Sequence, residues 1–313
     1  MFKSLDYIAN KYIDAEIIYE KQMGSSFQNF MTLTNISKEF LPLNTYTTKD
    51  IFNIWKDYRV YNFIQDKYCH TPILFEGFKE IVGFTHIKKC IDEGGIFATY
   101  HFGDYRYIPY YLTKLVNIDS LHISTDIDTY NKEKRLAIWK ECRKIYPVKD
   151  ILSEKICTST TFLKKMNKGE SIILCLDDSI KSNETYDIIN IKHLSSMVKM
   201  KINVFKLIYF SKKPMCILIS DRNEEGLSRL TAYPHFYILQ KDNIKHAANY
   251  SYHLFQTKLE TQPQLWSLWC KHHQNVTKWN ELPVGTTNPS IDWKIDNNAL
   301  GLDIGTGHIH KIS

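Results

Sequence analysis

The feature that most constrains the fold is a change in the spacing of apolar residues at Gly94-Gly95. Within residues 1 to about 90, apolar positions recur every three or four residues, which predicts helices, among them about 48–65 and 77–92. After the glycine pair, short apolar runs of strand length alternate with helical stretches. These runs are IFATY (96–100), SLHIST (120–125), SIILCL (171–176), MCILIS (215–220) and LTAYPHF (230–236), the last interrupted by Pro234.

Helices are expected between these strands, which predicts an α/β fold with a largely buried sheet. The helical segments are 105–116, 129–145, 158–169 and 240–260. With 313 residues, 43% of them hydrophobic, the chain can bury a large core. We predict one domain over residues 1–283, with a helical part (1–93) and an α/β core (94–283). The polar, turn-rich residues 284–313 are expected to form a C-terminal arm.

Composition narrows the class of protein further. A net charge of +6 spread along the chain suits an acidic carrier, an anionic cofactor or a headgroup layer, and is not the dense basic stripe of a nucleic-acid binder. The seven cysteines form no CxxC pair and predict reduced thiols of a cytosolic protein. No apolar run reaches the roughly 18 residues of a membrane span. A cytoplasmic protein, soluble or peripheral to the inner membrane, is expected.

The segment Tyr100–Arg106 (YHFGDYR) is the sharpest candidate site. His101 follows a predicted strand directly, and the carboxyl ends of strands are where ligands bind in α/β folds. A histidine there can take a proton from an attacking hydroxyl or amine near neutral pH. A nearby carboxylate would orient the ring, and Asp104 is the nearest in sequence. The helix after it would direct free N–H groups at the same place. Structural roles compete: a histidine of the core, and Asp104 as a helix N-cap.

Other polar clusters are less specific. Asp177-Asp178, after the strand SIILCL, could orient an acceptor or bind a cation, or form a solvated turn. Cys270, His272 and His273 lack a second ligand pair at zinc spacing, so a structural role is expected and no metal site is predicted. LGLDIGTG (300–307) is similar to the phosphate loop of actin-like ATPases, but almost no chain follows it, which indicates a strand and turn.

Four blocks in order, over roughly residues 74 to 273, resemble the bacterial lipid A (lauroyl/myristoyl) acyltransferase branch of the lysophospholipid acyltransferase superfamily. They are LFEGFKEIVGFTHIKKCIDEGGIFATYHFGDYR, TFLKKMNKGESIILCLDD, MKINVFKLIYFSKKPMCILIS and QPQLWSLWCKHH. In the family motif a histidine is followed five positions later by Asp or Glu. His101 and Gly103 match this motif, whereas Arg106 stands at the acidic position. Asp177 matches the family's aspartate after the central strand.

The resemblance implies a mixed sheet flanked by helices, and acyl transfer from a coenzyme A or acyl carrier protein thioester to an amine or hydroxyl, with no further cofactor. His101 is then the general base, Asp104 its first candidate partner, and Asp177 the second or a substrate-binding residue. Arg106 is expected to bind an anionic substrate group, or to pair with Asp104 or Asp177. Because the family's membrane anchor is not evident, the acceptor is expected to be a soluble small molecule or peptide. Competing functions are a peripheral lipid acyltransferase, a thioester hydrolase and a non-catalytic acyl-binding protein.

Overall fold

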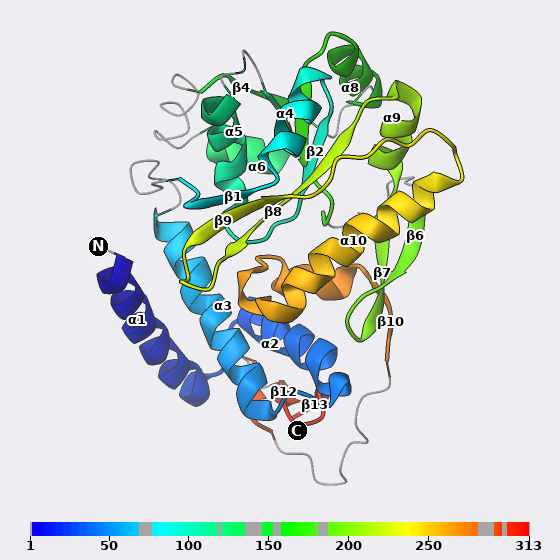
Figure 1. Ribbon diagram of the computed structural model, residues 1–313. Helices are drawn as coiled ribbons and strands as arrows, with labels where there is room; N and C mark the ends of the chain where they lie inside the picture. Colours follow the sequence, from blue (N-terminus) through cyan, green and yellow to red (C-terminus); the bar gives the residue numbers. More distant parts are fainter. Residues whose placement is uncertain are drawn as a thin grey trace.

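The computed structural model describes residues 2–68, 77–116, 118, 121–134, 146–152, 158–178, 180, 187–280, 291–295 and 299–312. The elements are arranged as an α/β fold, with a mixed central sheet between layers of helices (Figure 1). The α/β class predicted from the alternation of apolar runs is therefore confirmed. No helix among these residues has the length and apolarity needed to cross a membrane.

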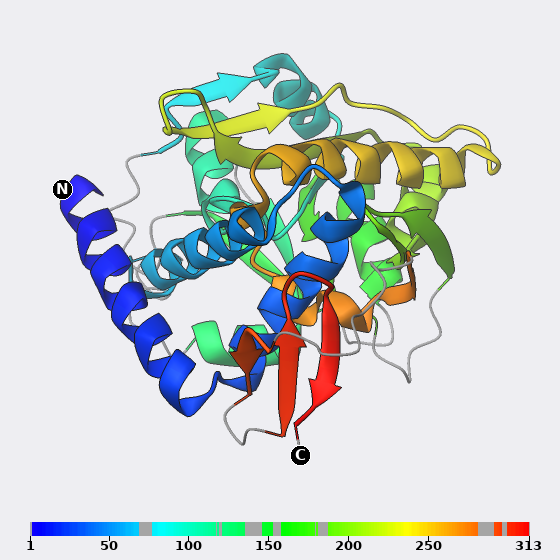
Figure 2. The same ribbon diagram turned by 90° about the horizontal axis from the view of Figure 1, so that it is seen from below.

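The N-terminal part is helical, as predicted, up to the edge of the central sheet. Its helices are α1 (Phe2–Met23), α2 (Phe27–Phe40), the 3₁₀ helix η1 (Leu41–Leu43), α3 (Thr48–Tyr68) and α4 (Phe84–Asp92). Helix α2 begins after Ser26, whose Oγ accepts the N–H of Asn29 at 3.3 Å. Helix α1 lies at the periphery against α3 (Figures 1 and 2), where Arg59 pairs with Glu16 at 2.7 Å and Glu20 at 3.0 Å.

The helix predicted over 77–92 is wrong in its first half. Residues Glu80–Val82 form strand β1, which pairs in parallel with β9 at the edge of the central sheet. Gly83 then adopts a φ of +76°, and a Cβ there would lie 2.0 Å from the carbonyl oxygen of Ala232. The β-branched pair Ile81-Val82 and this close approach explain why the chain is extended before α4 begins.

The central sheet has the strand order β1-β9-β8-β2-β5-β3-β4. All neighbouring strands are parallel except β8 and β9, which form an antiparallel hairpin. The strands are β2 (Ile96–Thr99), β3 (Leu121–Thr125), β4 (Val148–Leu152), β5 (Ser171–Cys175), β8 (Met215–Arg222) and β9 (Ser228–Ala232). Four of the five predicted strands are confirmed, and the fifth, predicted over 230–236, is confirmed only for 230–232, because β9 ends before Pro234. Strand β4 was not predicted, because VKDIL mixes charged and apolar residues.

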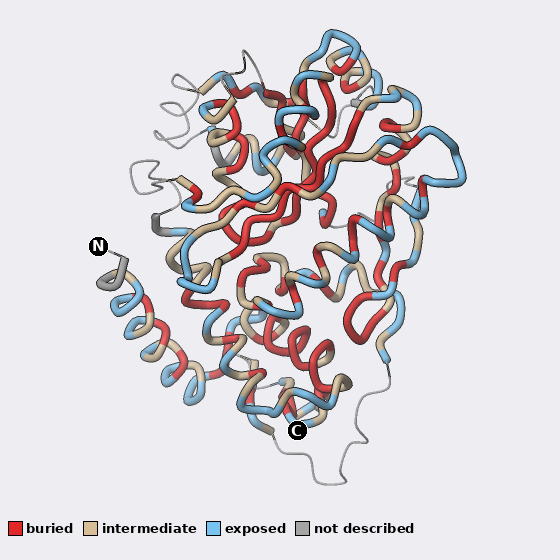
Figure 3. The backbone as a smooth tube through the Cα atoms, viewed as in Figure 1, coloured by how far each residue is buried: buried red, intermediate tan, exposed pale blue. Residues whose placement is uncertain are grey.

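The central strands are largely buried (Figure 3), and alternate residues along them pack in two different hydrophobic clusters. Ile96 and Ala98 of β2 pack in the larger cluster, with α8, α9, α10 and the N-terminal helices. Phe97 packs in the smaller one, with α4 and α5. The helices of the core are α5 (Ile108–Val116), α6 (Ile127–Glu133), α8 (Thr158–Asn167), α9 (Asn203–Ser211) and α10 (Asn243–Thr261). The helix predicted over 129–145 falls partly outside the described residues.

Two small sheets complete the fold. The first, in the order β10-β7-β6, contains β6 (Ile188–Lys192), β7 (Ser196–Lys201) and β10 (Val276–Trp279), none of which was predicted. The second contains β11 (Trp293–Lys294), β12 (Leu300–Asp303) and β13 (His308–Lys311). The strand and turn expected at 300–307 are confirmed. Trp293, from the segment expected to be an arm, is 2% exposed and packs on Trp55 with ring centroids 5.0 Å apart.

Candidate active site

His101 and Asp177 meet because their strands are parallel neighbours in register. Thr99 at the end of β2 lies opposite Cys175 at the end of β5, and each functional residue comes two positions later. The carboxylate of Asp177 accepts the backbone N–H of His101 at 3.0 Å. It also lies 2.9 Å from the Nδ1 atom of the imidazole. The carboxyl ends of β2 and β5 therefore bring both the backbone N–H and the imidazole of His101 to the carboxylate of Asp177.

The His101–Asp177 pair is held from the other side by residues 265–267. The indole Nε1 of Trp266 donates to Oδ2 of Asp177 at 2.8 Å. The N–H of Ser267 donates to the carbonyl of His101 at 2.9 Å. Both residues belong to the QPQLWSLWC block, which the sequence analysis had linked to the acyltransferase resemblance without assigning a role to either. The Pro-x-x-Trp pattern was the signal for Trp266.

The Nε2 atom of His101 is on the side of the ring away from the Asp177 contact. The side chain of His101 is 20% exposed, and Nε2 lies 3.8 Å from Oδ1 of Asp178, whose own side chain is 61% exposed. With Nδ1 donating to Asp177, Nε2 carries the lone pair that can accept a proton. His101 therefore has a carboxylate partner, and it is Asp177, the second choice from the sequence, rather than Asp104.

Charge around the ring favours its protonated form. Burial opposes the imidazolium, but the neighbouring Cys175, Asp177 and Tyr105 together raise the pKa of His101 well above its usual value. The edge of Tyr105 lies against the imidazole, with ring centroids 4.8 Å apart and an interplanar angle of 66°. The surroundings of His101 therefore stabilise the imidazolium form of its side chain.

Asp104 is not the partner of His101, although it was the first choice from sequence. Its side chain is 5% exposed and forms an ion pair with Arg222. It also accepts hydrogen bonds from Ser228 Oγ at 2.5 Å and Gln65 Nε2 at 2.9 Å. Burial opposes the charge of this carboxylate, but Arg222 outweighs it and lowers the pKa of Asp104. Asp104 also makes no side-chain N-cap hydrogen bond, so the expected helix-cap role is wrong as well.

The turn after His101 does not offer its first amides to a substrate. The N–H groups of Phe102, Gly103 and Asp104 donate to Tyr100 O, Leu265 O and Ser220 Oγ, respectively. The following residues form a 3₁₀ turn, η3 (Tyr105–Tyr107), before α5 begins at Ile108. Gly103 is required here, because its φ is +59° and a Cβ would lie 2.2 Å from the carbonyl oxygen of Ser220. These three amides are therefore not available to a substrate oxyanion. The free N–H groups expected from the sequence were those at the start of the helix after Asp104, and that expectation stays a prediction.

Cys175 lies beside the imidazole, whereas Arg106 is connected to it through Tyr105. The Nε of Arg106 donates to the hydroxyl of Tyr105 at 3.1 Å, so one aromatic ring links the guanidinium to His101. Candidate ligand atoms of Cys175, His101 and Asp177 all lie within 4.8 Å of one another. Cys175 was not predicted to lie beside His101, because it is distant in the chain and only the β2–β5 register brings it there. Burial raises the pKa of the Cys175 thiol, although His101 opposes this shift.

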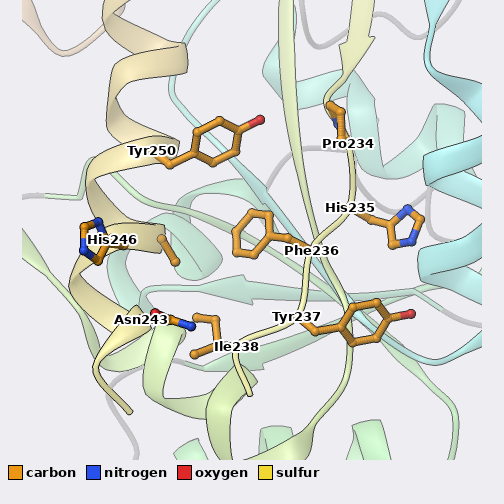
Figure 4. Close-up of a pocket in the computed structure, with 9 residues that line it drawn as sticks. Pro234, His235, Phe236, Tyr237, Ile238, Asn243, His246 and Tyr250 are labelled. Atoms are coloured by element: carbon orange, nitrogen blue, oxygen red, sulfur yellow. The ribbon is translucent and has the colours of Figure 1, made fainter. Parts of the chain in front are cut away.

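A surface hollow lies at the opposite end of the sheet from His101. It measures about 310 Å³ and is lined by residues 234–238 and the first two turns of α10, including Tyr250 (Figure 4). Phe236 bridges Met215 at the start of β8, and Met215 pairs with Ile96 at the start of β2. Since His101 follows the end of β2, this hollow is not part of the His101 site.

Comparisons with known proteins do not assign a family. The sequence matches no family model and no curated protein. Among solved structures, the chain is similar to the crystal structure of the pilus retraction motor PilT with bound ADP, over 63% of each chain, with 12% sequence identity and a TM-score of 0.30. A likeness at this score carries no argument about the fold or the function.

Proposed function

We propose that the protein is an acyltransferase that moves a fatty acyl group from a coenzyme A or acyl carrier protein thioester to an amine or hydroxyl. The observation that carries the proposal is the His101–Asp177 pair, with Nδ1 held at 2.9 Å and Nε2 facing away from that contact. Nε2 removes the proton of the acceptor as the acceptor attacks the thioester carbonyl. The tetrahedral adduct then expels the thiolate, which takes up a proton and leaves as the free thiol.

The residues around Nε2 support roles for both substrates. Asp178 Oδ1, 3.8 Å from Nε2, can hold an acceptor amine or hydroxyl beside the base. Arg106 lies on the far side of Tyr105, where its guanidinium can bind a phosphate or carboxylate of a substrate. Asp104, buried with Arg222, supports the turn that carries His101 and takes no direct part.

Cys175 defines a second chemical route. A thiol beside a histidine and a carboxylate is the composition of a cysteine nucleophile, which would form an acyl-enzyme before transfer or hydrolysis. Nucleophilic cysteines depend on a lowered thiol pKa, whereas burial raises the pKa of Cys175. Direct transfer is therefore favoured over the acyl-enzyme route.

Helix α1 supports a second acceptor class, a membrane lipid. Its large hydrophobic residues with side chains in solvent are Tyr7, Ile8, Tyr12, Ile18, Tyr19 and Met23, each at least 48% exposed. Such residues can insert into the headgroup region of a bilayer. Co-sedimentation with liposomes of mixed anionic and zwitterionic phospholipid separates the two acceptor classes. Binding that an Ile8→Ser/Ile18→Ser variant loses would favour the peripheral lipid acyltransferase; no binding would favour a soluble acceptor.

The proposed function is tested with acyl-CoA and acyl carrier protein donors of graded chain length and a panel of amine and hydroxyl acceptors. Mass spectrometry should find acylated acceptor and free thiol in equal amounts. Free fatty acid without acylated acceptor would instead identify a thioester hydrolase. Donor binding without turnover would identify an acyl-binding protein, and either result would overturn the proposal.

A further inference from the structure

A second histidine–carboxylate group lies in the core, away from the exposed face of His101. It consists of Glu39 near the end of α2, His193 in the turn between β6 and β7, and His272 in the 3₁₀ helix η5 (Trp269–Gln274). Glu39 and His193 are fully buried and His272 is 3% exposed. One carboxylate oxygen and one nitrogen of each imidazole lie within 4.8 Å of one another. We call this group the Glu39–His193–His272 cluster.

The carboxylate of Glu39 is oriented by hydrogen bonds from the chain around it. The N–H of Ser195 donates to Oε2 at 2.7 Å, and Ser196 Oγ donates to Oε1 at 2.5 Å. Nε2 of His272 is 2.5 Å from the same Oε1 atom. Since Ser195 and Ser196 adjoin His193, the short β6–β7 turn fixes two of the three members relative to each other.

His193 is the member of the cluster whose side chain has an atom without a hydrogen-bond partner among the described residues. Its Nδ1 lies 2.8 Å from the hydroxyl of Tyr252. Its Nε2 is buried and has no hydrogen-bond partner among the residues that the structure describes. Leaving a buried polar atom unsatisfied costs roughly 1–3 kcal/mol. The Nδ1–Tyr252 contact fixes the ring as outer-sphere hydrogen bonds fix metal-binding histidines, with the other nitrogen available as a ligand.

The geometry of the three groups suits a cation between them. Oε1 of Glu39 is already in contact with Nε2 of His272 and Oγ of Ser196, and the unsatisfied Nε2 of His193 belongs to the same buried cluster. A carboxylate oxygen and two imidazole nitrogens therefore lie close together in the core, within 4.8 Å of one another.

We propose that Glu39, His193 and His272 bind a divalent first-row transition-metal ion, of which Zn²⁺ is the type. Two imidazoles and one carboxylate are ligands that zinc takes and that magnesium and calcium do not favour. On binding, the His272 imidazole takes the tautomer with its proton at Nδ1, so that Nε2, which contacts Glu39 Oε1 in the absence of the ion, can serve as a ligand. A water or the Ser196 hydroxyl, which already bonds Glu39 Oε1, completes the coordination. Sequence spacing did not indicate this site, because the ligands come from three distant segments.

The location gives the ion a structural role next to the His101 site. The indole of Trp266 packs against both imidazoles, with centroids 5.9 Å from His193 and 5.3 Å from His272. The same indole donates to Asp177, which holds His101. An ion that fixes the two imidazole rings therefore also fixes Trp266, and through it the orienting carboxylate. The metal itself takes no part in acyl transfer.

The test measures metal content in protein purified without chelators. The starting chain carries His86→Ala and His235→Ala, because this partly exposed histidine pair, with Nδ1 atoms 3.0 Å apart, could bind ions on its own. About one equivalent of metal is expected by plasma mass spectrometry, and none after His193→Ala. The matched control is His273→Ala, which changes the neighbour of His272 outside the cluster and should keep the metal.

A second measurement needs no substitution within the Glu39–His193–His272 cluster. The same chain treated with a chelator should melt at a lower temperature, and one equivalent of Zn²⁺ should restore it. Co²⁺ in its place should give the visible absorption of a four-coordinate site with nitrogen and oxygen ligands. Folded protein that contains no metal and gains no thermal stability from Zn²⁺, Co²⁺ or Mn²⁺ would overturn the proposal. Metal retained in the folded His193→Ala variant would place the ion elsewhere and would also overturn it.

Discussion

Two buried aspartates near His101, Asp177 and Asp104, are almost equally withdrawn from solvent and yet have different partners. Their side chains are 4% and 5% exposed, respectively. Asp177 faces an imidazole that can gain and lose a proton, whereas Asp104 faces a guanidinium whose charge is fixed. The comparison shows that burial near a candidate base does not make a carboxylate functional. In the proposed reaction, the carboxylate that takes part is the one whose partner changes charge.

The largest expected effect is that of removing the base. His101→Ala should lower single-turnover acyl transfer by about 10²–10⁴-fold, the usual contribution of general-base assistance. At a pH above the raised pKa of His101, its melting temperature should stay close to that of the wild type, because the Asp177 carboxylate still accepts hydrogen bonds from the N–H of residue 101 and from the indole of Trp266. The matched control is His253→Ala, an exposed histidine of α10. A wild-type rate in His101→Ala at saturating donor and acceptor would rule out His101 as the base.

Asp177→Asn should have the next largest effect, a fall in turnover of roughly 10²-fold, at the lower end of the range for general acid–base assistance. The reason is that an amide no longer stabilises the imidazolium or selects the reactive tautomer. The matched variant at the other aspartate is Asp104→Asn. Turnover should fall far more in Asp177→Asn than in Asp104→Asn, measured on folded protein at one pH. Equal losses, or a larger loss in Asp104→Asn, would reverse the assignment of the orienting residue.

The pH dependence of acyl transfer should also distinguish Asp177 from Asp104. Acyl transfer needs neutral His101, so the rate should rise by about tenfold per pH unit and level off above the raised pKa of His101, which lies above the ordinary value of about 6.5. The midpoint should move to lower pH in Asp177→Asn and stay in place in Asp104→Asn. The groups facing the ring are Cys175, Asp177, Asp178 and Tyr105. A midpoint unchanged in Asp177→Asn would contradict the pairing.

The raised pKa of His101 also determines how its contribution to the free energy of unfolding changes with pH. A group whose pKa is raised on folding stabilises the folded state below its unfolded pKa, here about 6.5, and loses this contribution as the pH rises through its folded pKa. Chemical denaturation of the wild type and His101→Ala over this range should therefore show the wild-type advantage shrinking with increasing pH.

Asp104→Ala is expected to lower the free energy of unfolding much more than the rate of acyl transfer. It leaves the Arg222 guanidinium, whose side chain is 27% exposed, without its carboxylate, and breaking such a buried pair costs about 3–5 kcal/mol. Turnover of the protein that remains folded should change by less than about threefold, well below the effect of general-base loss. Urea denaturation gives the first quantity and single-turnover kinetics the second. A large kinetic loss with unchanged stability would return Asp104 to a catalytic role.

Cys175→Ala should have the smallest effect. If the acceptor attacks the thioester directly, the variant retains turnover within about threefold, since the thiol is neither base nor nucleophile. Intact-mass analysis of wild-type protein mixed with donor alone should show no acyl adduct. Complete loss of transfer in Cys175→Ala, together with an acyl thioester on Cys175 in the wild type, would establish the acyl-enzyme route instead.

Parts of the fold and the site were predictable because local patterns encode them. The apolar runs at 96–100 and 171–176 have the length and composition of buried strands, and β2 and β5 are found there. His101 and Asp177 stand just after those runs, so the sequence singled both out. Strands β6, β7 and β10 were missed, because their alternating lysines and apolar residues make short, half-exposed strands in a separate sheet.

The sequence by itself determined the α/β class and the placement of His101 and Asp177 at strand ends, since the period of apolar residues and the turn at Gly103 are local properties of the chain. Only the tertiary structure decided which carboxylate His101 meets. The parallel register of β2 and β5 brings Asp177 and Cys175 to the imidazole, while the end of β8 supplies Arg222 to Asp104. Likewise, Trp266 and the Glu39–His193–His272 cluster depend on contacts between distant segments, which no local pattern specifies.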